Sequence, residues 1–157
     1  MTFHELSAQT IEGATRSLGD FRGQVALVVN TASACGFTPQ YTGLEALWQE
    51  RKGDGLVVLG FPSNDFGAQE PGTEAEIQSF CSTRYDVSFP MFAKVQTKGP
   101  GQSPVYAFLT AKHGEPKWNF HKYLVGKNGE VLAAFPSKVS PSDPQLRAAI
   151  DEALRAG

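Results

Sequence analysis

Uninterrupted apolar runs are the clearest feature in the pattern of hydrophobic and polar positions. Residues 25–29 and 56–59 are continuous aliphatic runs. Such runs are typical of strands covered on both faces, as in parallel or mixed sheets. Two further runs, 123–125 and 131–135, flank Asn128-Gly129, a dipeptide that favours a tight hairpin turn. The sequence therefore predicts a central sheet built from these segments.

Helices are indicated where apolar side chains recur every three or four residues. Thr73 and Glu76 have the spacing of a capping box in front of one such segment, which carries Cys81. Pro residues near the start of other segments suit a first helical turn. The predicted helices begin near Thr38, at Glu74, at Ser103 and after Asp143.

The order of these elements predicts the fold class. A short hairpin around Glu12-Gly13 comes first, and strands and helices then alternate before a second hairpin and a last helix. This order predicts one α/β domain over residues 1–157, with a central mixed sheet flanked by helices. No linker, internal repeat or low-complexity segment interrupts it.

Composition excludes several classes of function. The net charge is −2, and the 14 Lys and Arg residues are scattered, so no nucleic-acid binding is expected. No apolar run approaches the roughly 20 residues of a membrane span, so stable membrane insertion is not expected. Residues 1–10 lack the basic start and apolar stretch of a signal peptide, which favours a cytoplasmic location.

The two cysteines pose the main chemical question. They are too few for a disulfide scaffold, and with the three histidines they show no zinc-type spacing, so neither a metal nor another cofactor is expected. Cys35 follows a buried strand and precedes a predicted helix, a position where backbone N–H groups favour a thiolate. A buried structural cysteine is the alternative, because free Cys is among the most buried residue types.

Two familiar arrangements of reactive cysteine are missing. A thioredoxin-type Cys-x-x-Cys motif would need a second Cys at position 38, where Thr38 stands. A Cys–His hydrolase needs an imidazole base, and His4, His113 and His121 belong to no recognisable motif. If Cys35 is reactive, it acts alone or with a partner distant in the sequence.

Several segments resemble the signatures of the glutathione peroxidase family. Residues 30–38, from Asn30 to Thr38 around Cys35, resemble the first signature. Residues 59–72 resemble the second, residues 118–120 the third, and residues 89–92 also fit. These matches occur in order and lie between about Ala26 and Phe135.

The resemblance implies a thioredoxin-like fold and a peroxidatic site. The implied catalytic residues are Cys35, Gln69, Trp118 and Asn119. A Cys35 thiolate would attack a peroxide oxygen and become a sulfenic acid. The side-chain N–H groups of the other three residues suit stabilisation of the expelled oxygen. The backbone N–H of Gly36 is a further candidate donor.

The same resemblance assigns a role to Cys81. It matches the resolving cysteine of thioredoxin-dependent members, which would form an intramolecular disulfide with Cys35 that thioredoxin reduces. Ser63 stands where many such members carry a third cysteine, so Cys81 is the remaining candidate. Because a disulfide needs Cα atoms within about 7 Å, the helix around Cys81 is expected to unwind partly during turnover.

Other readings remain open at this point. Glutathione could be the reductant with Cys81 a bystander, or the protein could be a peroxide sensor that passes its oxidation to a partner protein. The short segment 111–117 lacks the long insertion of tetrameric, glutathione-using members. We therefore expect a monomer with an open site that accepts hydrogen peroxide and organic or lipid hydroperoxides.

Overall fold

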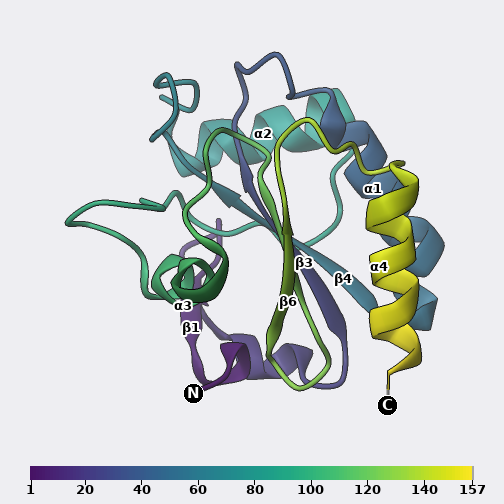
Figure 1. The fold of residues 1–157 in the computed structure, drawn as a ribbon. Helices are drawn as coiled ribbons and strands as arrows, with labels where there is room; N and C mark the ends of the chain where they lie inside the picture. Colours follow the sequence, from purple (N-terminus) through teal and green to yellow (C-terminus); the bar gives the residue numbers. More distant parts are fainter. Residues whose placement is uncertain (157) are drawn as a thin grey trace.

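A mixed sheet forms the centre of the computed structural model, which describes residues 1–156 (Figure 1). Its strands lie in the order β4-β3-β5-β6, where β3 and β4 are parallel and the other neighbours antiparallel. Every residue of β3 and β4 is buried, which confirms the sequence prediction of strands covered on both faces. The strands are β3 (Val25–Thr31), β4 (Leu56–Pro62), β5 (Lys122–Val125) and β6 (Val131–Phe135).

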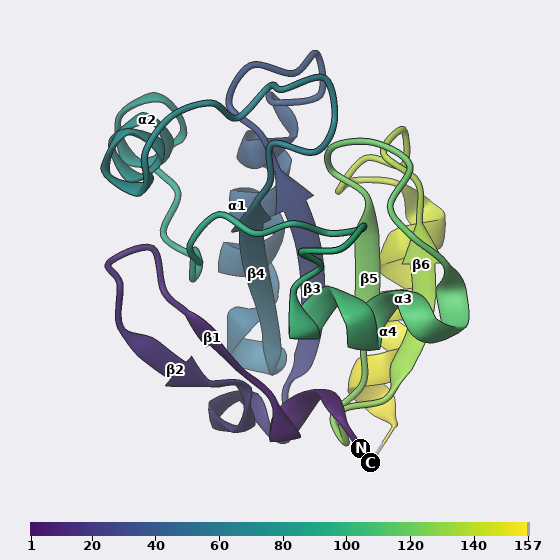
Figure 2. The same cartoon turned by 90° about the vertical axis from the view of Figure 1, so that its left-hand side faces the viewer.

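Helices cover both faces of this sheet, as Figure 2 shows. The helices α1 (Gln40–Arg51) and α4 (Pro144–Arg155) pack on one face, against alternate residues of β3 such as Leu27. On the opposite face α3 (Pro104–His113) packs in a second apolar cluster. The helix α2 (Glu74–Tyr85) lies beyond β4 and contributes Ile77 and Cys81 to the first cluster.

The N-terminal hairpin predicted around Glu12-Gly13 is confirmed, with β1 (Ser7–Gln9) antiparallel to β2 (Thr15–Ser17). The predicted capping box is also confirmed, because Thr73 and Glu76 exchange side-chain to backbone hydrogen bonds in front of α2. Short 3-10 helices occur at η1 (Phe3–Glu5), η2 (Leu18–Phe21) and η3 (Lys52–Asp54).

The start of α1 differs from the prediction. The helix begins at Gln40 rather than near Thr38, and Pro39 is its N-cap. The reason is local: the Thr38 hydroxyl accepts a hydrogen bond from the N–H of Cys35 and donates to the carbonyl of Ala32. Residues 36–39 therefore form turns that lead into the helix.

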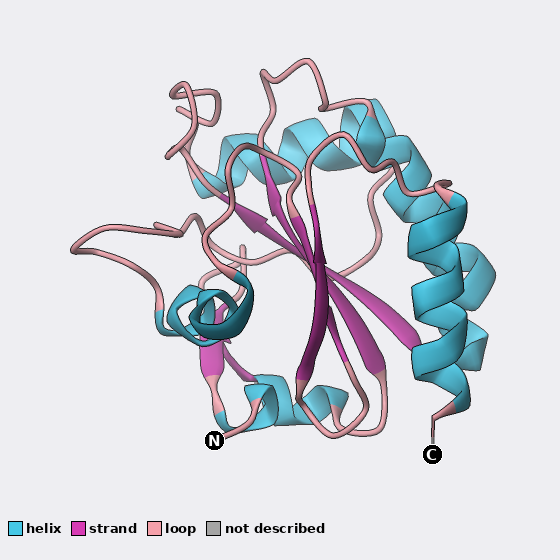
Figure 3. Ribbon diagram, in the orientation of Figure 1, coloured by secondary structure: helices cyan, strands magenta, loops and turns pink. Residues whose placement is uncertain are grey.

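Three loops emerge at one end of the sheet (Figure 3). Residues 32–39 follow β3 and residues 63–73 follow β4, so both leave from the carboxyl ends of parallel strands. Residues 114–121 lead into the antiparallel β5 and reach the same end. In α/β sheets this edge is the common location of reactive groups.

Candidate active site

Cys35 is held in the loop after β3 by a compact set of hydrogen bonds. Its N–H donates to Thr38 Oγ1 at 2.9 Å, and that hydroxyl donates to the carbonyl of Ala32 at 2.8 Å. The N–H of Phe37 donates to Cys35 Sγ at 3.3 Å. A backbone N–H group is therefore directed at the sulfur of this residue.

The donor to this sulfur is set by the turn that follows Cys35. The hydrogen bond to Sγ comes from the N–H of Phe37, and the N–H of Gly36 stays a predicted donor to the reacting oxygen. The turn from Cys35 to Thr38 directs the Phe37 amide back toward the side chain of residue 35, and Thr38 N–H closes it onto Cys35 O at 3.0 Å. This local geometry depends on φ and ψ values that a residue pattern does not specify.

Gln69 and Asn119 meet although 50 positions separate them in the sequence. Asn119 is fully buried, and its Nδ2 donates to Gln69 Oε1 at 2.9 Å and to the carbonyl of Phe66 at 3.3 Å. With its oxygen engaged in this way, the half-buried Gln69 side chain keeps its own Nε2 for another acceptor. The N–H of Ala34 donates to the backbone oxygen of Gln69 at 3.1 Å, which joins this pair to the Cys35 loop.

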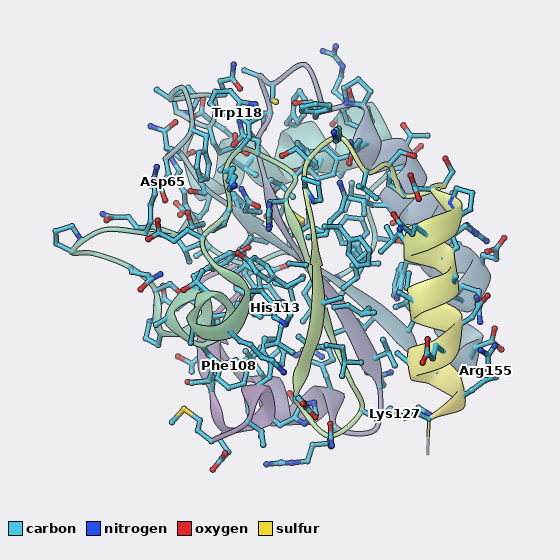
Figure 4. The ribbon with its side chains drawn as sticks, viewed as in Figure 1. Asp65, Phe108, His113, Trp118, Lys127 and Arg155 are labelled. Atoms are coloured by element: carbon cyan, nitrogen blue, oxygen red, sulfur yellow. The ribbon has the colours of Figure 1, made fainter. Side chains whose placement is uncertain are left out.

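Trp118 forms part of the rim of the same end of the molecule and is 36% exposed (Figure 4). Its ring lies beside Phe66, with ring centroids 6.0 Å apart. It also covers Gly67, whose φ is +69°, and a Cβ at that position would lie 3.0 Å from the indole. Because Gly67 has no side chain, the indole of Trp118 can lie against it. Its positive φ also forms the left-handed turn that leads to Gln69.

Asn30 is a residue of this site that the sequence analysis did not single out. It is fully buried near the end of β3, and its Nδ2 donates to the carbonyl of Trp118 at 3.0 Å. Its own carbonyl accepts the N–H of Phe120 at 2.6 Å. The signal in the sequence was a polar residue directly after an apolar run. If the amide is buried together with that run, it needs hydrogen-bond partners, and these hold neighbouring segments in place.

Among the predicted site residues, Gln69, Trp118 and Asn119 form one cluster. The Cys35 loop adjoins that cluster through the hydrogen bond between Ala34 and Gln69. Within residues 1–156 no hydrogen bond joins Cys35 Sγ to the three side chains of the cluster.

Cys81 is a free thiol on α2 and is only 2% exposed. It belongs to the same buried apolar cluster as Cys35. Burial raises the pKa of the Cys81 thiol to about 11, the Tyr41 hydroxyl partly offsets that rise, and the charge of Glu70 adds to it. In this position the Cys81 thiol is protonated near neutral pH and is a poor nucleophile.

The remainder of the described chain offers no sign of a metal centre or membrane segment. Residues 1–156 contain no group of three or more His, Cys, Asp or Glu side chains placed to hold a metal ion. Over the same residues, no helix has the length and apolar character needed to cross a bilayer. The chemistry that the arrangement supports is that of a thiol beside amide and indole N–H groups.

Known proteins resemble this chain over most of its length. The family model described as glutathione peroxidase matches residues 3–110. A hydroperoxy fatty acid reductase from Synechocystis is 46% identical over 153 residues, which cover 90% of each chain. A glutathione peroxidase-like peroxiredoxin from Schizosaccharomyces pombe is 45% identical over 144 residues, covering 88% of this chain and 91% of the relative.

Solved structures support the fold. The crystal structure of Trgpx in its apo form superposes with a TM-score of 0.81 at 33% identity, covering 99% of this chain and 97% of that one. A thioredoxin family protein from Chlorobium tepidum reaches a TM-score of 0.72 at 15% identity, covering 95% and 92%. The latter likeness concerns the fold alone, and it confirms the expected thioredoxin-like architecture.

Proposed function

The chain belongs to the glutathione peroxidase family and is a peroxidase, and we propose that it reduces hydroperoxides through Cys35, with Cys81 as resolving cysteine and thioredoxin as reductant. The observation that carries the proposal is the Cys35 loop, in which an N–H group is directed at the thiol sulfur beside the cluster of Gln69, Trp118 and Asn119. The family supplies the reaction, and the local geometry suggests which groups perform it.

In the proposed first step, the Cys35 thiolate attacks one oxygen of the hydroperoxide. The O–O bond breaks, a sulfenic acid forms on Cys35, and the expelled alkoxide or hydroxide takes a proton and leaves as alcohol or water. The Nε2 of Gln69 and the indole N–H of Trp118 would stabilise the expelled oxygen. Both Nδ2 hydrogens of Asn119 are donated to protein acceptors, which supports a role in orienting Gln69.

In the proposed second step, the Cys81 thiolate attacks the sulfur of the sulfenic acid. An S–S bond forms, the S–O bond breaks, and the expelled hydroxide takes up a proton and leaves as water. Thioredoxin then returns both residues to thiols by thiol–disulfide exchange. The raised pKa of buried Cys81 favours a movement of α2 before this step, because the thiol must lose its proton and reach Cys35.

The exposed apolar side chains at the rim of the site indicate which class of hydroperoxide it accepts. Phe37 and Trp118 are each 36% exposed, and they carry large apolar side chains, Phe37 two positions after Cys35 and Trp118 directly before Asn119. An organic hydroperoxide with an apolar chain can cover such groups and remove them from water. We therefore propose that organic and lipid hydroperoxides are substrates besides hydrogen peroxide. We also propose that the protein works as a monomer, because the short segment 111–117 lacks the long insertion of tetrameric members.

Steady-state kinetics with two reductants test the proposal. Hydroperoxide reduction is followed with thioredoxin, thioredoxin reductase and NADPH, and separately with glutathione, for the wild type and for Cys81→Ser. Ser82→Ala, an exposed position on the same helix, serves as the matched control. We expect turnover with thioredoxin that Cys81→Ser abolishes and Ser82→Ala retains.

Other results would redirect the assignment. Full turnover of Cys81→Ser with glutathione would make Cys81 a bystander. Rapid oxidation of Cys35 without turnover by either reductant would favour a peroxide sensor that transfers its disulfide to another protein.

A further inference from the structure

Lys122 is a fully buried lysine without an acidic partner. It lies at the start of β5 with 0% of its side chain exposed. Within residues 1–156 no carboxylate lies within salt-bridge distance of its Nζ. Lysine is rarely buried unless it is paired, because the desolvation of its charge is costly. Its place in the core therefore requires a specific role.

The Nζ group donates two hydrogen bonds to backbone carbonyls from different segments. One acceptor is Phe120 O at 2.7 Å, and the other is Ser137 O at 3.2 Å. Burial lowers the pKa of Lys122 to about 7. The ammonium form and the neutral amine both carry enough N–H groups to serve two carbonyls, so the contacts do not depend on the charge.

The first acceptor belongs to the segment that carries two of the proposed site residues. Phe120 follows Trp118 and Asn119 directly, and its φ is +64°. A bulky residue in this left-handed region is strained and persists only where its surroundings hold it. Phe120 is held on both sides, since its N–H donates to Asn30 O and its carbonyl accepts from Lys122.

The second acceptor connects Lys122 with the helix that follows Cys35. Ser137 O also accepts a hydrogen bond from Gln40 Nε2 at 2.8 Å. Gln40 is the first residue of α1, five positions after Cys35. One carbonyl thus joins the lysine, the segment after β6 and the beginning of α1.

We propose that Lys122 is a positioning residue for the peroxidase reaction, whose two hydrogen bonds hold the segment 118–120 in a fixed relation to the start of α1. It acts through the backbone of Phe120, and so it places Trp118 and Asn119 relative to Cys35. This inference rests on the proposed function of those residues.

The test compares two lysines that make similar contacts at opposite ends of the sheet. Lys122→Met keeps an unbranched side chain but loses the donors. In the matched control, Lys127→Met, the lost contact is the bond from Nζ to Leu154 O at 2.7 Å, far from Trp118 (Figure 4). Lys122→Arg retains donors and is the conservative variant.

Each variant is made in a Trp48→Phe background, which leaves Trp118 as the single fluorophore of its kind. The rate constant for Cys35 oxidation is measured in a single turnover with hydroperoxide, and acrylamide quenching of Trp118 reports on the segment. We expect Lys122→Met to slow oxidation at least 10-fold and to change the quenching. Lys127→Met should stay within 2-fold of the background protein, and Lys122→Arg should recover at least part of the lost rate.

Distinct outcomes separate the inference from the proposed function. A folded Lys122→Met with the oxidation rate and quenching of the background protein would overturn the positioning role. If Lys122→Met does not fold, Lys122→Leu, which also lacks the donors, is measured instead, and an unchanged rate in that variant overturns the inference equally. A background protein whose Cys35 does not react with hydroperoxide would instead overturn the proposed function.

Discussion

The reactivity of Cys81 gives a quantitative test of how the resolving step begins. Burial raises the pKa of this thiol from its ordinary value of 9.0 to about 11. At pH 8 roughly 0.1% of Cys81 is then thiolate, against roughly 9% of a thiol with the ordinary value. Because the thiolate is the nucleophile, the folded protein should alkylate about 90-fold more slowly than the unfolded chain, and burial of the sulfur adds to this factor.

The assay uses Cys35→Ser, in which Cys81 is the single remaining cysteine. Its alkylation by iodoacetamide at pH 8 is followed by mass spectrometry in native buffer and in urea, with N-acetylcysteine as the control for the effect of urea on the reagent. We expect a native rate at least 50-fold below the unfolded rate, rising at urea concentrations below the global transition as α2 opens. A native rate within 3-fold of the unfolded rate would refute the reasoning, since Cys81 would then be reactive in place.

Three further predictions concern the surroundings of Cys35. Thr38→Val removes the acceptor for the Cys35 N–H and should lower the free energy of unfolding by about 1–3 kcal/mol in urea titrations, because buried backbone groups lose their partners. Asn119→Ala releases the Gln69 side chain and should slow Cys35 oxidation about 10- to 100-fold in stopped-flow measurements; an unchanged rate would exclude the orienting role. The pKa of Lys122 falls from 10.5 to about 7 on folding, so the unfolded chain binds more protons between these values and stability rises with pH. From pH 7 to pH 9 the wild type should gain about 2–3 kcal/mol relative to Lys122→Met in urea titrations, and parallel curves would contradict this.

Local signals in the sequence predicted most of the elements of the fold. The apolar runs at 25–29 and 56–59 lie in the two buried parallel strands, and Thr73 with Glu76 begins α2 as the capping box predicted. These signals succeed because strand burial and helix capping depend on residues close together in the chain.

The details of the site depend on contacts that no local pattern encodes. The hydrogen bond between Asn119 and Gln69 joins residues 50 positions apart, and no periodicity connects them. The left-handed Phe120 and the buried Lys122 contradict the usual preferences of their residue types. Both are stabilised by carbonyl and N–H groups from other segments, so only the assembled fold explains them.

The most direct test of the central claim is the covalent state of the two cysteines after one equivalent of hydroperoxide. The protein is oxidised without reductant, free thiols are blocked, and the intact mass and the peptide map are recorded. The proposed mechanism predicts that the wild type loses two hydrogen atoms and yields a linked peptide containing Cys35 and Cys81, whereas Cys81→Ser stops at a Cys35 sulfenic acid. A wild type that keeps a free, alkylatable Cys81 while Cys35 carries the sulfenic acid would contradict the mechanism.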